Sequence, residues 1–137
     1  CIRDRVIVTP VGSRLADVAA LKSKRAVVIR GSSHAEHLEK LGVPEENMLL
    51  VAFTLECFTA VSDGEADYTL ADSAAAEAQL RSDEQLEISC TLPGKDDYGF
   101  AVPKESAELL SALNEFVAEM RSSGKLDEII ARHMTLE

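Results

Sequence analysis

The sequence contains few of the residues and patterns by which several classes of protein are recognised. Only 14 of its 137 residues are lysine or arginine, against 24 aspartates and glutamates, so the formal net charge is -10 at pH 7. Nucleic acid and anionic membrane surfaces are bound by clustered basic side chains, so this charge balance argues against both partners. No apolar run approaches the roughly 20 residues of a membrane-spanning helix, and no signal peptide is recognisable.

Cysteines and common catalytic motifs are equally scarce. Cys1, Cys57 and Cys90 form no C-x-x-C pair and no close Cys/His spacing, so neither a disulfide nor a zinc site is predicted. There is no glycine-rich phosphate loop with a lysine and no G-x-S-x-G elbow. His34 and His37 are three residues apart but have no further ligand at a suitable spacing, so we interpret them as part of a solvated helix face. Catalysis is a minority hypothesis, and neither a metal nor a cofactor is predicted.

What the sequence does contain is an alternation of short apolar runs with helix and turn signals. Its length and a hydrophobic content of 46% are enough for one domain with its own core. Ala26–Ile29 and residues 48–52 are continuous apolar runs typical of strands buried on both faces. Residues 86–90 predict a further strand, and the opening segment predicts another. Strands that alternate with short helices predict an α/β fold with a mostly parallel, doubly wound sheet.

Two of the predicted junctions between a strand and the following helix contain hydroxyl groups. Ser32 and Ser33 follow the first apolar run, and Ser33 forms an S-x-x-E capping box with Glu36, so a helix is predicted to begin there. Thr54 follows the second run and is predicted to cap the next helix. Hydroxyls and amides at the start of a helix suit an anionic group such as a carboxylate.

A third junction contains an acid. Residues 68–70 predict a short buried strand, and Asp72 with Ser73 precedes an alanine-rich run that strongly favours helix. In a parallel sheet Asp72 lies at the same edge as the two hydroxyl junctions, where open α/β sheets bind ligands. A carboxylate suits a cation, so the three junctions together predict a receptor for a zwitterion or a polar small molecule. The alternative is that all of these residues only cap their helices.

The pattern changes after residue 93. Residues 98–102 predict a strand, which is followed by a longer helix over about residues 106–121 and a short final helix beyond Gly124. Apolar residues recur on one face of the longer helix at Leu109, Leu110, Leu113, Phe116, Val117 and Met120. We interpret this apolar stripe as a packing surface. Packing back on the same lobe and forming a homodimer are its two alternatives.

Four segments contain motifs in a specific order: residues 21–33 (LKSKRAVVIRGSS), residues 63–72 (DGEADYTLAD), residues 98–104 (YGFAVPK) and the tail from Leu109 to Ile129. They resemble segments of the type II periplasmic solute-binding proteins, specifically family 3, which binds amino acids and related polar solutes. The resemblance covers roughly residues 21–133. It implies a single domain over residues 1–137, with a second-lobe α/β core at 21–93 and a return strand with C-terminal helices at 94–137.

The same resemblance assigns roles to the junction residues. By position, Ser32 and Ser33 are expected to bind the carboxylate of a ligand and Asp72 its amino group, with Thr54 as a weaker candidate. Nothing before Leu21 corresponds to the first lobe of the family, so half of the expected ligand cage is missing. A single lobe is expected to bind weakly, at millimolar affinity or worse (roughly -4 kcal/mol).

The resemblance implies a non-enzymatic, extracytoplasmic solute-binding domain of the kind that serves ABC transporters, periplasmic or membrane-anchored in the full-length protein. Its expected partners are a small amino-acid-like ligand and a membrane transporter. Residues 64–73 (GEADYTLADS) also resemble the solute-binding-like domain of membrane-bound lytic murein transglycosylases. The alternative function is therefore a regulatory or sensor module, fused to such a transglycosylase or to a sensor kinase, whose ligand binding is reduced or lost.

Overall fold

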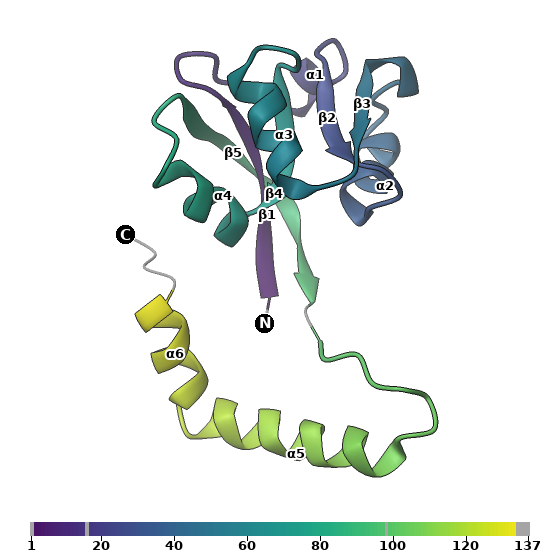
Figure 1. Cartoon of the computed structure of the whole chain (residues 1–137), viewed down its shortest axis with the longest axis vertical. Coiled ribbons are helices and arrows are strands. Elements are labelled where there is room, and N and C mark those ends of the chain that lie inside the picture. The colour runs from purple at the N-terminus through teal and green to yellow at the C-terminus, as the bar shows by residue number, and fades with distance from the viewer. Residues whose placement is uncertain (1, 16, 98, 134–137) are drawn as a thin grey trace. The chain divides into compact units, whose positions relative to one another are not determined.

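A computed structural model of the protein describes residues 2–15, 17–97 and 99–133. Its backbone contacts separate two compact units, Cys1–Asp97 and Tyr98–Glu137. The first unit contains a sheet with helices packed on it, and the described part of the second consists of two helices and the segment that precedes them (Figure 1).

The first unit is built on a five-stranded sheet with the order β3-β2-β4-β1-β5. Its strands are β1 (Ile2–Pro10), β2 (Ala26–Ile29), β3 (Met48–Val51), β4 (Tyr68–Asp72) and β5 (Leu86–Asp97). β2 is parallel to β3 and β4, whereas β1 is antiparallel to both β4 and β5. Four strands therefore run in one direction, and β1 lies between β4 and β5 and runs in the opposite direction. The predicted α/β fold with mostly parallel strands is confirmed, and β1 makes the sheet mixed.

Helices cover both faces of this sheet. They are α1 (Val18–Leu21), α2 (Ser33–Lys40), α3 (Thr54–Ser62) and α4 (Ser73–Leu80), with a 3-10 turn at Glu45–Asn47. Side chains alternate between the faces of a strand, so on β1 Val6 and Val8 face one core and Ile7 faces the other. α3 and α4 pack on the first face, and α1 and α2 pack on the second. The sheet is thus doubly wound, as predicted.

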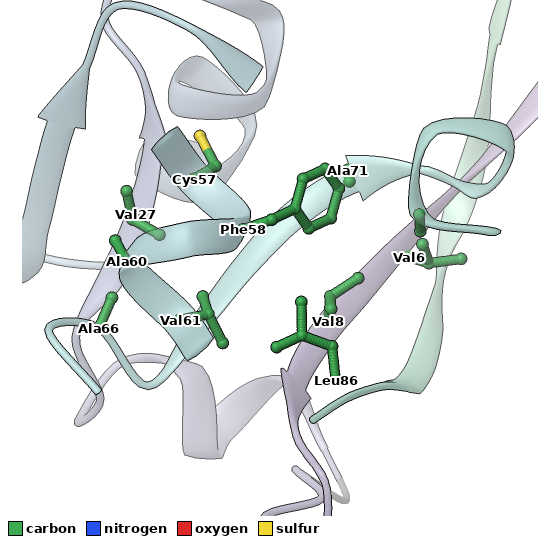
Figure 2. Close-up of a cluster of buried hydrophobic side chains, with 11 residues drawn as sticks. Val6, Val8, Val27, Cys57, Phe58, Ala60, Val61, Ala66, Ala71 and Leu86 are labelled. Atoms are coloured by element: carbon green, nitrogen blue, oxygen red, sulfur yellow. The ribbon is translucent and has the colours of Figure 1, made fainter. Parts of the chain in front are cut away.

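The core under α3 shows why this helix forms where it does. Cys57, Phe58, Ala60 and Val61 recur at helical spacing, and all four are buried against the sheet. Figure 2 shows Phe58 and Val61 pointing from α3 toward the strands. The helix is thereby packed against β1, β2 and β4.

The ribbon formed by β1 and β5 continues past the end of β4. Arg5 is the β1 residue paired with Asp72, the last residue of β4, whereas Ile2–Asp4 pair only with the end of β5. The register shifts between Asp4 and Arg5, where β5 contains Gly94 with a φ of +102°. A Cβ on Gly94 would lie 3.1 Å from Nη1 of Arg5, the far end of a flexible side chain, so it is the positive φ that favours glycine here.

One predicted strand is absent. β5 runs to Asp97, whereas residues 99–102 form no strand, and Tyr98 lies outside the described residues. The apolar alternation of this segment resembled a strand, but the described part of the second unit contains no strand to pair with. Pro103, which lacks an N–H, also disfavours a ladder at this point.

The second unit consists of α5 (Ala107–Ser122) and α6 (Lys125–His133). Both ends of α5 agree to within one residue with the long helix predicted over about residues 106–121. Gly124, with a φ of +75°, ends the helix as predicted. No described residue of α5 is buried, and Leu109, Leu110 and Phe116 of the apolar stripe are 49%, 46% and 52% exposed.

Candidate functional site

The three polar junctions lie at one edge of the sheet. β2, β3 and β4 run in the same direction, so Ser32, Thr54 and Asp72 all follow the carboxyl ends of parallel strands. β2 and β4 are neighbours, which makes the junctions of Ser32 and Asp72 adjacent. β3 lies on the far side of β2 from β4, so the Thr54 junction is roughly 10 Å from that of Asp72 at ordinary strand spacing.

The first junction is a tight turn into α2. Gly31 has a φ of +67°, and the N–H of Ser32 donates to the carbonyl of Ile29 at 3.1 Å. Ser32 is the N-cap, because its Oγ accepts a hydrogen bond from the N–H of Ala35 at 3.2 Å. The helix therefore begins as predicted near Ser33, but Ser32 is its N-cap and Ser33 its first residue. Position N3 is then Ala35 rather than Glu36, so the predicted capping box of Ser33 with Glu36 is wrong.

This geometry leaves hydrogen-bond donors at the start of α2. An Oγ that accepts a hydrogen bond still has its own proton to donate, so Ser32 is both a cap and a donor. The N–H groups of Ser33 and His34 belong to the first turn, where a helix has no carbonyl of its own to bond them. Together these donors form an anion-binding arrangement of the kind that carboxylates occupy.

The second junction is arranged differently from the prediction. The N-cap position of α3 is Phe53, and Thr54 is the first helical residue, so Thr54 does not cap the helix. Glu56 supplies the cap instead, because its Oε2 accepts from the N–H of Ala52 at 2.8 Å and of Phe53 at 2.9 Å. A carboxylate already bonds these two amides, which leaves this junction less suited to an anionic ligand than the first.

Asp72, at the third junction, occupies the N-cap position of α4, but its side chain makes no capping hydrogen bond there. The carboxylate instead approaches α2, with Oδ1 lying 3.4 Å from Nε2 of His34. The two side chains are 24% and 18% exposed, so the pair is half-buried at the edge of the sheet. The carboxylate is thus directed toward the first junction rather than used to begin α4.

His34 was missed as a site residue. The sequence predicted a solvated helix face, whereas the side chain is half-buried and paired with Asp72. These residues are 38 positions apart, and only the adjacency of β2 and β4 brings them together. The i, i+3 spacing of His34 and His37, which superficially resembles a metal-binding pair, plays no part in the contact of His34 with Asp72.

Arg5 is a second basic residue beside Asp72. It is the cross-strand partner of Asp72 in the antiparallel pairing of β1 with β4, so both side chains leave the sheet on the same face. That face is the one covered by α1 and α2, because Ile7 and Leu70, two residues along each strand, belong to that core. Asp72 therefore lies between a strand that contributes Arg5 and a helix that contributes His34.

Of the two cysteines that the structure describes, Cys57 is buried and Cys90 is partly buried. Cys57 and Cys90 are free thiols, and burial raises the pKa of both. Among the described residues, no group of three or more His, Cys, Asp or Glu side chains is arranged to hold a metal ion. No helix within the described ranges is long and apolar enough to cross a membrane.

The arrangement of the junctions at the edge of the sheet is suited to non-covalent recognition of a small molecule with both an anionic and a cationic group.

Comparison with known proteins gives homologues of two kinds. No protein-family model matches the chain. The chain is 33% identical over 122 residues to membrane-bound lytic murein transglycosylase F of Idiomarina loihiensis, a match that covers 85% of this chain and 27% of that protein. It is 27% identical over 117 residues to a probable amino-acid ABC transporter periplasmic-binding protein, y4tE, of Sinorhizobium fredii, covering 77% of this chain and 38% of that protein.

A solved structure agrees with these matches. A mutant of ArgBP from T. maritima superposes with a TM-score of 0.85 at 26% identity, covering 98% of this chain and 59% of that one. The chain thus spans less than two thirds of the length of each of these proteins. It is a homologue of the family 3 solute-binding proteins, whose members include amino-acid-binding proteins and to which a domain of membrane-bound lytic murein transglycosylase F is related.

Proposed function

We propose that this chain is an extracytoplasmic domain that binds an amino acid or a similar small polar solute, as part of a binding protein that serves an ABC transporter. The observation that supports the proposal most strongly is the adjacency of two complementary junctions. The start of α2 presents donors for an anion, and Asp72 presents a carboxylate for a cation on the neighbouring strand. An α-amino acid has both groups on one carbon.

In this proposal Ser32 and Ser33 bind the carboxylate of the ligand, through the Ser32 hydroxyl and the first-turn amides of α2. Asp72 binds its ammonium group. Thr54 contributes less, because its junction is one strand further away and Glu56 already bonds the adjacent amides. No catalytic residue is assigned, and the transporter remains a proposed partner.

The relatives support this class of ligand without defining the ligand of this chain. The Sinorhizobium fredii protein is named for amino-acid transport, and ArgBP has also been solved in an arginine-bound form. L-Arginine is therefore a reasonable first probe. The names also support the proposed location, since one relative is described as periplasmic and another as membrane-bound.

The proposal is tested by titrating the 137-residue chain with the standard amino acids and comparing two acid-to-amide variants. Asp72→Asn removes the carboxylate at the site, and Asp63→Asn makes the same change in the exposed loop before β4, at the opposite edge of the sheet. We expect Asp72→Asn to weaken binding about ten-fold or more, which corresponds to about 1.4 kcal/mol, and Asp63→Asn to leave it unchanged. Equal affinities for Asp72→Asn and the wild type, with the fold intact, would contradict the proposal.

A second candidate function is favoured by the match to the transglycosylase. At 33% identity over 122 residues, that match supports a regulatory module of a cell-wall lytic enzyme, in which the site binds a muropeptide or has lost binding. A titration with small muropeptides separates the two functions. Shifts of the Ser33 and Asp72 amides with muropeptides, and none with amino acids, would favour the regulatory module.

A further inference from the structure

We propose that His34 makes ligand affinity at this site depend on pH, because its protonated imidazole competes with the cationic group of the ligand for Asp72. The inference rests on the proposed function, because it assumes that Asp72 receives the ammonium group. It begins from a contact between two elements that are remote in sequence. Nε2 of His34 lies 3.4 Å from Oδ1 of Asp72, with both side chains half-buried.

The position of His34 is fixed by the structure around it. α2 is capped by Ser32, and its buried residues Ala35 and Leu38 belong to the core on this face of the sheet. His34 precedes Ala35 directly, so the anchoring of the first turn holds the imidazole beside the end of β4. Asp72 is held from the other side by the pairing of β4 with β1.

The surroundings make Asp72 the acidic partner of this imidazole. On the same helix, Glu36 pairs with Lys40 at 3.9 Å on the exposed side, and His37 is half-buried one turn further on. Of the other charged residues near this edge, Arg30 follows β2 and Arg5 lies across from Asp72 on β1. The carboxylate of Glu56, at the start of α3, is bonded by the amides of Ala52 and Phe53. The first turn of a helix also disfavours a positive charge, so Asp72 is the group that stabilises the imidazolium.

Protonation of His34 changes what Asp72 offers to a ligand. A histidine changes charge between about pH 5 and 8. When the imidazole is neutral, the Asp72 carboxylate is a hydrogen-bond and charge acceptor for an ammonium group. When the imidazole is protonated, an ammonium group must in addition compete with the imidazolium for this carboxylate. Binding of a cation and protonation of His34 therefore oppose one another, and the coupling is reciprocal.

The expected effect is modest, because the pair is partly exposed. Ion pairs of this kind contribute little, so the affinity for L-arginine should be about two- to five-fold stronger at pH 7.5 than at pH 5.5. The ligand keeps its charges over this range, so the change arises from the protein. His34→Gln should abolish the difference by retaining the high-pH affinity at both pH values.

Two further variants complete the test. His37→Gln removes the other imidazole of α2 and should keep the wild-type ratio. His34→Lys places a permanent cation at the position and should give the low-pH affinity at both pH values. Titrations of all four chains with L-arginine at pH 5.5 and 7.5, followed by amide chemical shifts, measure the ratios directly.

The outcomes separate this inference from the proposed function. A pH ratio that persists in His34→Gln, that is absent from the wild type, or that has the opposite sign would overturn the role of His34 while leaving the binding site in place. An absence of binding to the wild type by every amino acid at both pH values would overturn the proposed function and the inference with it.

Discussion

The hydroxyl of Tyr68 donates a hydrogen bond to the carbonyl oxygen of Leu21 at 3.1 Å. Both residues are fully buried, so this bond joins the beginning of β4 to the end of α1 inside the core. It lies at the opposite end of β4 from Asp72 and fixes the strand whose other end contributes to the proposed site.

Removing this hydroxyl should destabilise the fold without affecting ligand binding. Tyr68→Phe leaves the carbonyl of Leu21 buried without its donor, and we expect a loss of about 1 kcal/mol in the free energy of unfolding. Chemical denaturation measures the change. A variant as stable as the wild type would show that the bond makes no net contribution, and an altered affinity for a ligand would contradict the separation of core and site.

The buried hydroxyl of Tyr68 should also make the free energy of unfolding decrease at high pH. Burial, with a smaller contribution from the Asp67 carboxylate, raises the pKa of Tyr68 well above its ordinary value. Above about pH 10 an unfolded chain loses this proton, whereas the folded chain keeps it, so the unfolded state binds fewer protons and stability falls as pH rises.

Tyr68→Phe lacks this ionisation and should decline less steeply over the same range, by up to about 1.4 kcal/mol per pH unit. Urea denaturation of both chains between pH 9 and 11.5 compares the slopes. Identical slopes would show that Tyr68 ionises alike in the folded and unfolded chains.

Truncating two phenylalanines on different helices should change stability by very different amounts. Phe58 is 2% exposed in the core beneath α3, and Phe58→Ala should cost about 3–5 kcal/mol by leaving a cavity (Figure 2). Phe116, on the apolar stripe of α5, is 52% exposed, and Phe116→Ala should change stability by less than about 0.5 kcal/mol.

Denaturation at two protein concentrations tests the homodimer, which is one of the two alternatives for the apolar stripe. A large and concentration-dependent loss for Phe116→Ala would show that a second copy covers the stripe. A small loss that is independent of concentration is the expected result.

The buried thiol should be protected from alkylation. Cys57 is 5% exposed, and burial raises its pKa, although a hydrogen bond with Thr69 acts in the opposite direction. Thiolates react with iodoacetamide, so modification of Cys57 at pH 8 should be more than about ten-fold slower in the native chain than in denaturant. Mass spectrometry resolves the site, and equal rates in both conditions would contradict the buried placement of this residue.

Thr54 provides a graded test of the site. Thr54 lies at the second junction, and β2 separates its strand from that of Asp72, so Thr54→Val should change the affinity for an amino acid by less than about two-fold. A loss as large as that of Asp72→Asn, measured in the same titrations, would place the ligand across all three junctions rather than two.

The strands and helices could largely be predicted because their signals are local. The apolar run Ala26–Ile29 is a strand with the predicted bounds, and the periodicity of the longer helix located α5. The helix starts were less certain. Ser32 and Ser33 are consecutive and each suits an N-cap, so only the bond to Ala35 identifies Ser32. At Phe53 the cap is formed by Glu56, three residues later. The sequence favoured the Thr54 hydroxyl instead, because threonine is a common N-cap residue.

Long-range relationships could not be predicted from local patterns. Nothing in the β1 sequence indicates that it lies antiparallel between β4 and β5, since Val6, Ile7 and Val8 suit either direction. The contact of His34 with Asp72 follows from the adjacency of β2 and β4 rather than from spacing. Residues 99–102 have a strand-like composition, but a strand also requires a partner.

The central claim is that the start of α2 and the end of β4 form one site, and an amide-shift titration of the wild-type chain with L-arginine tests it most directly. We expect saturable shifts of the Ser33, His34 and Asp72 amides that share one dissociation constant, at millimolar affinity (roughly -4 kcal/mol). Asp63, at the opposite edge, should not shift. Shifts confined to one junction, or two junctions that saturate at different concentrations, would contradict a single site.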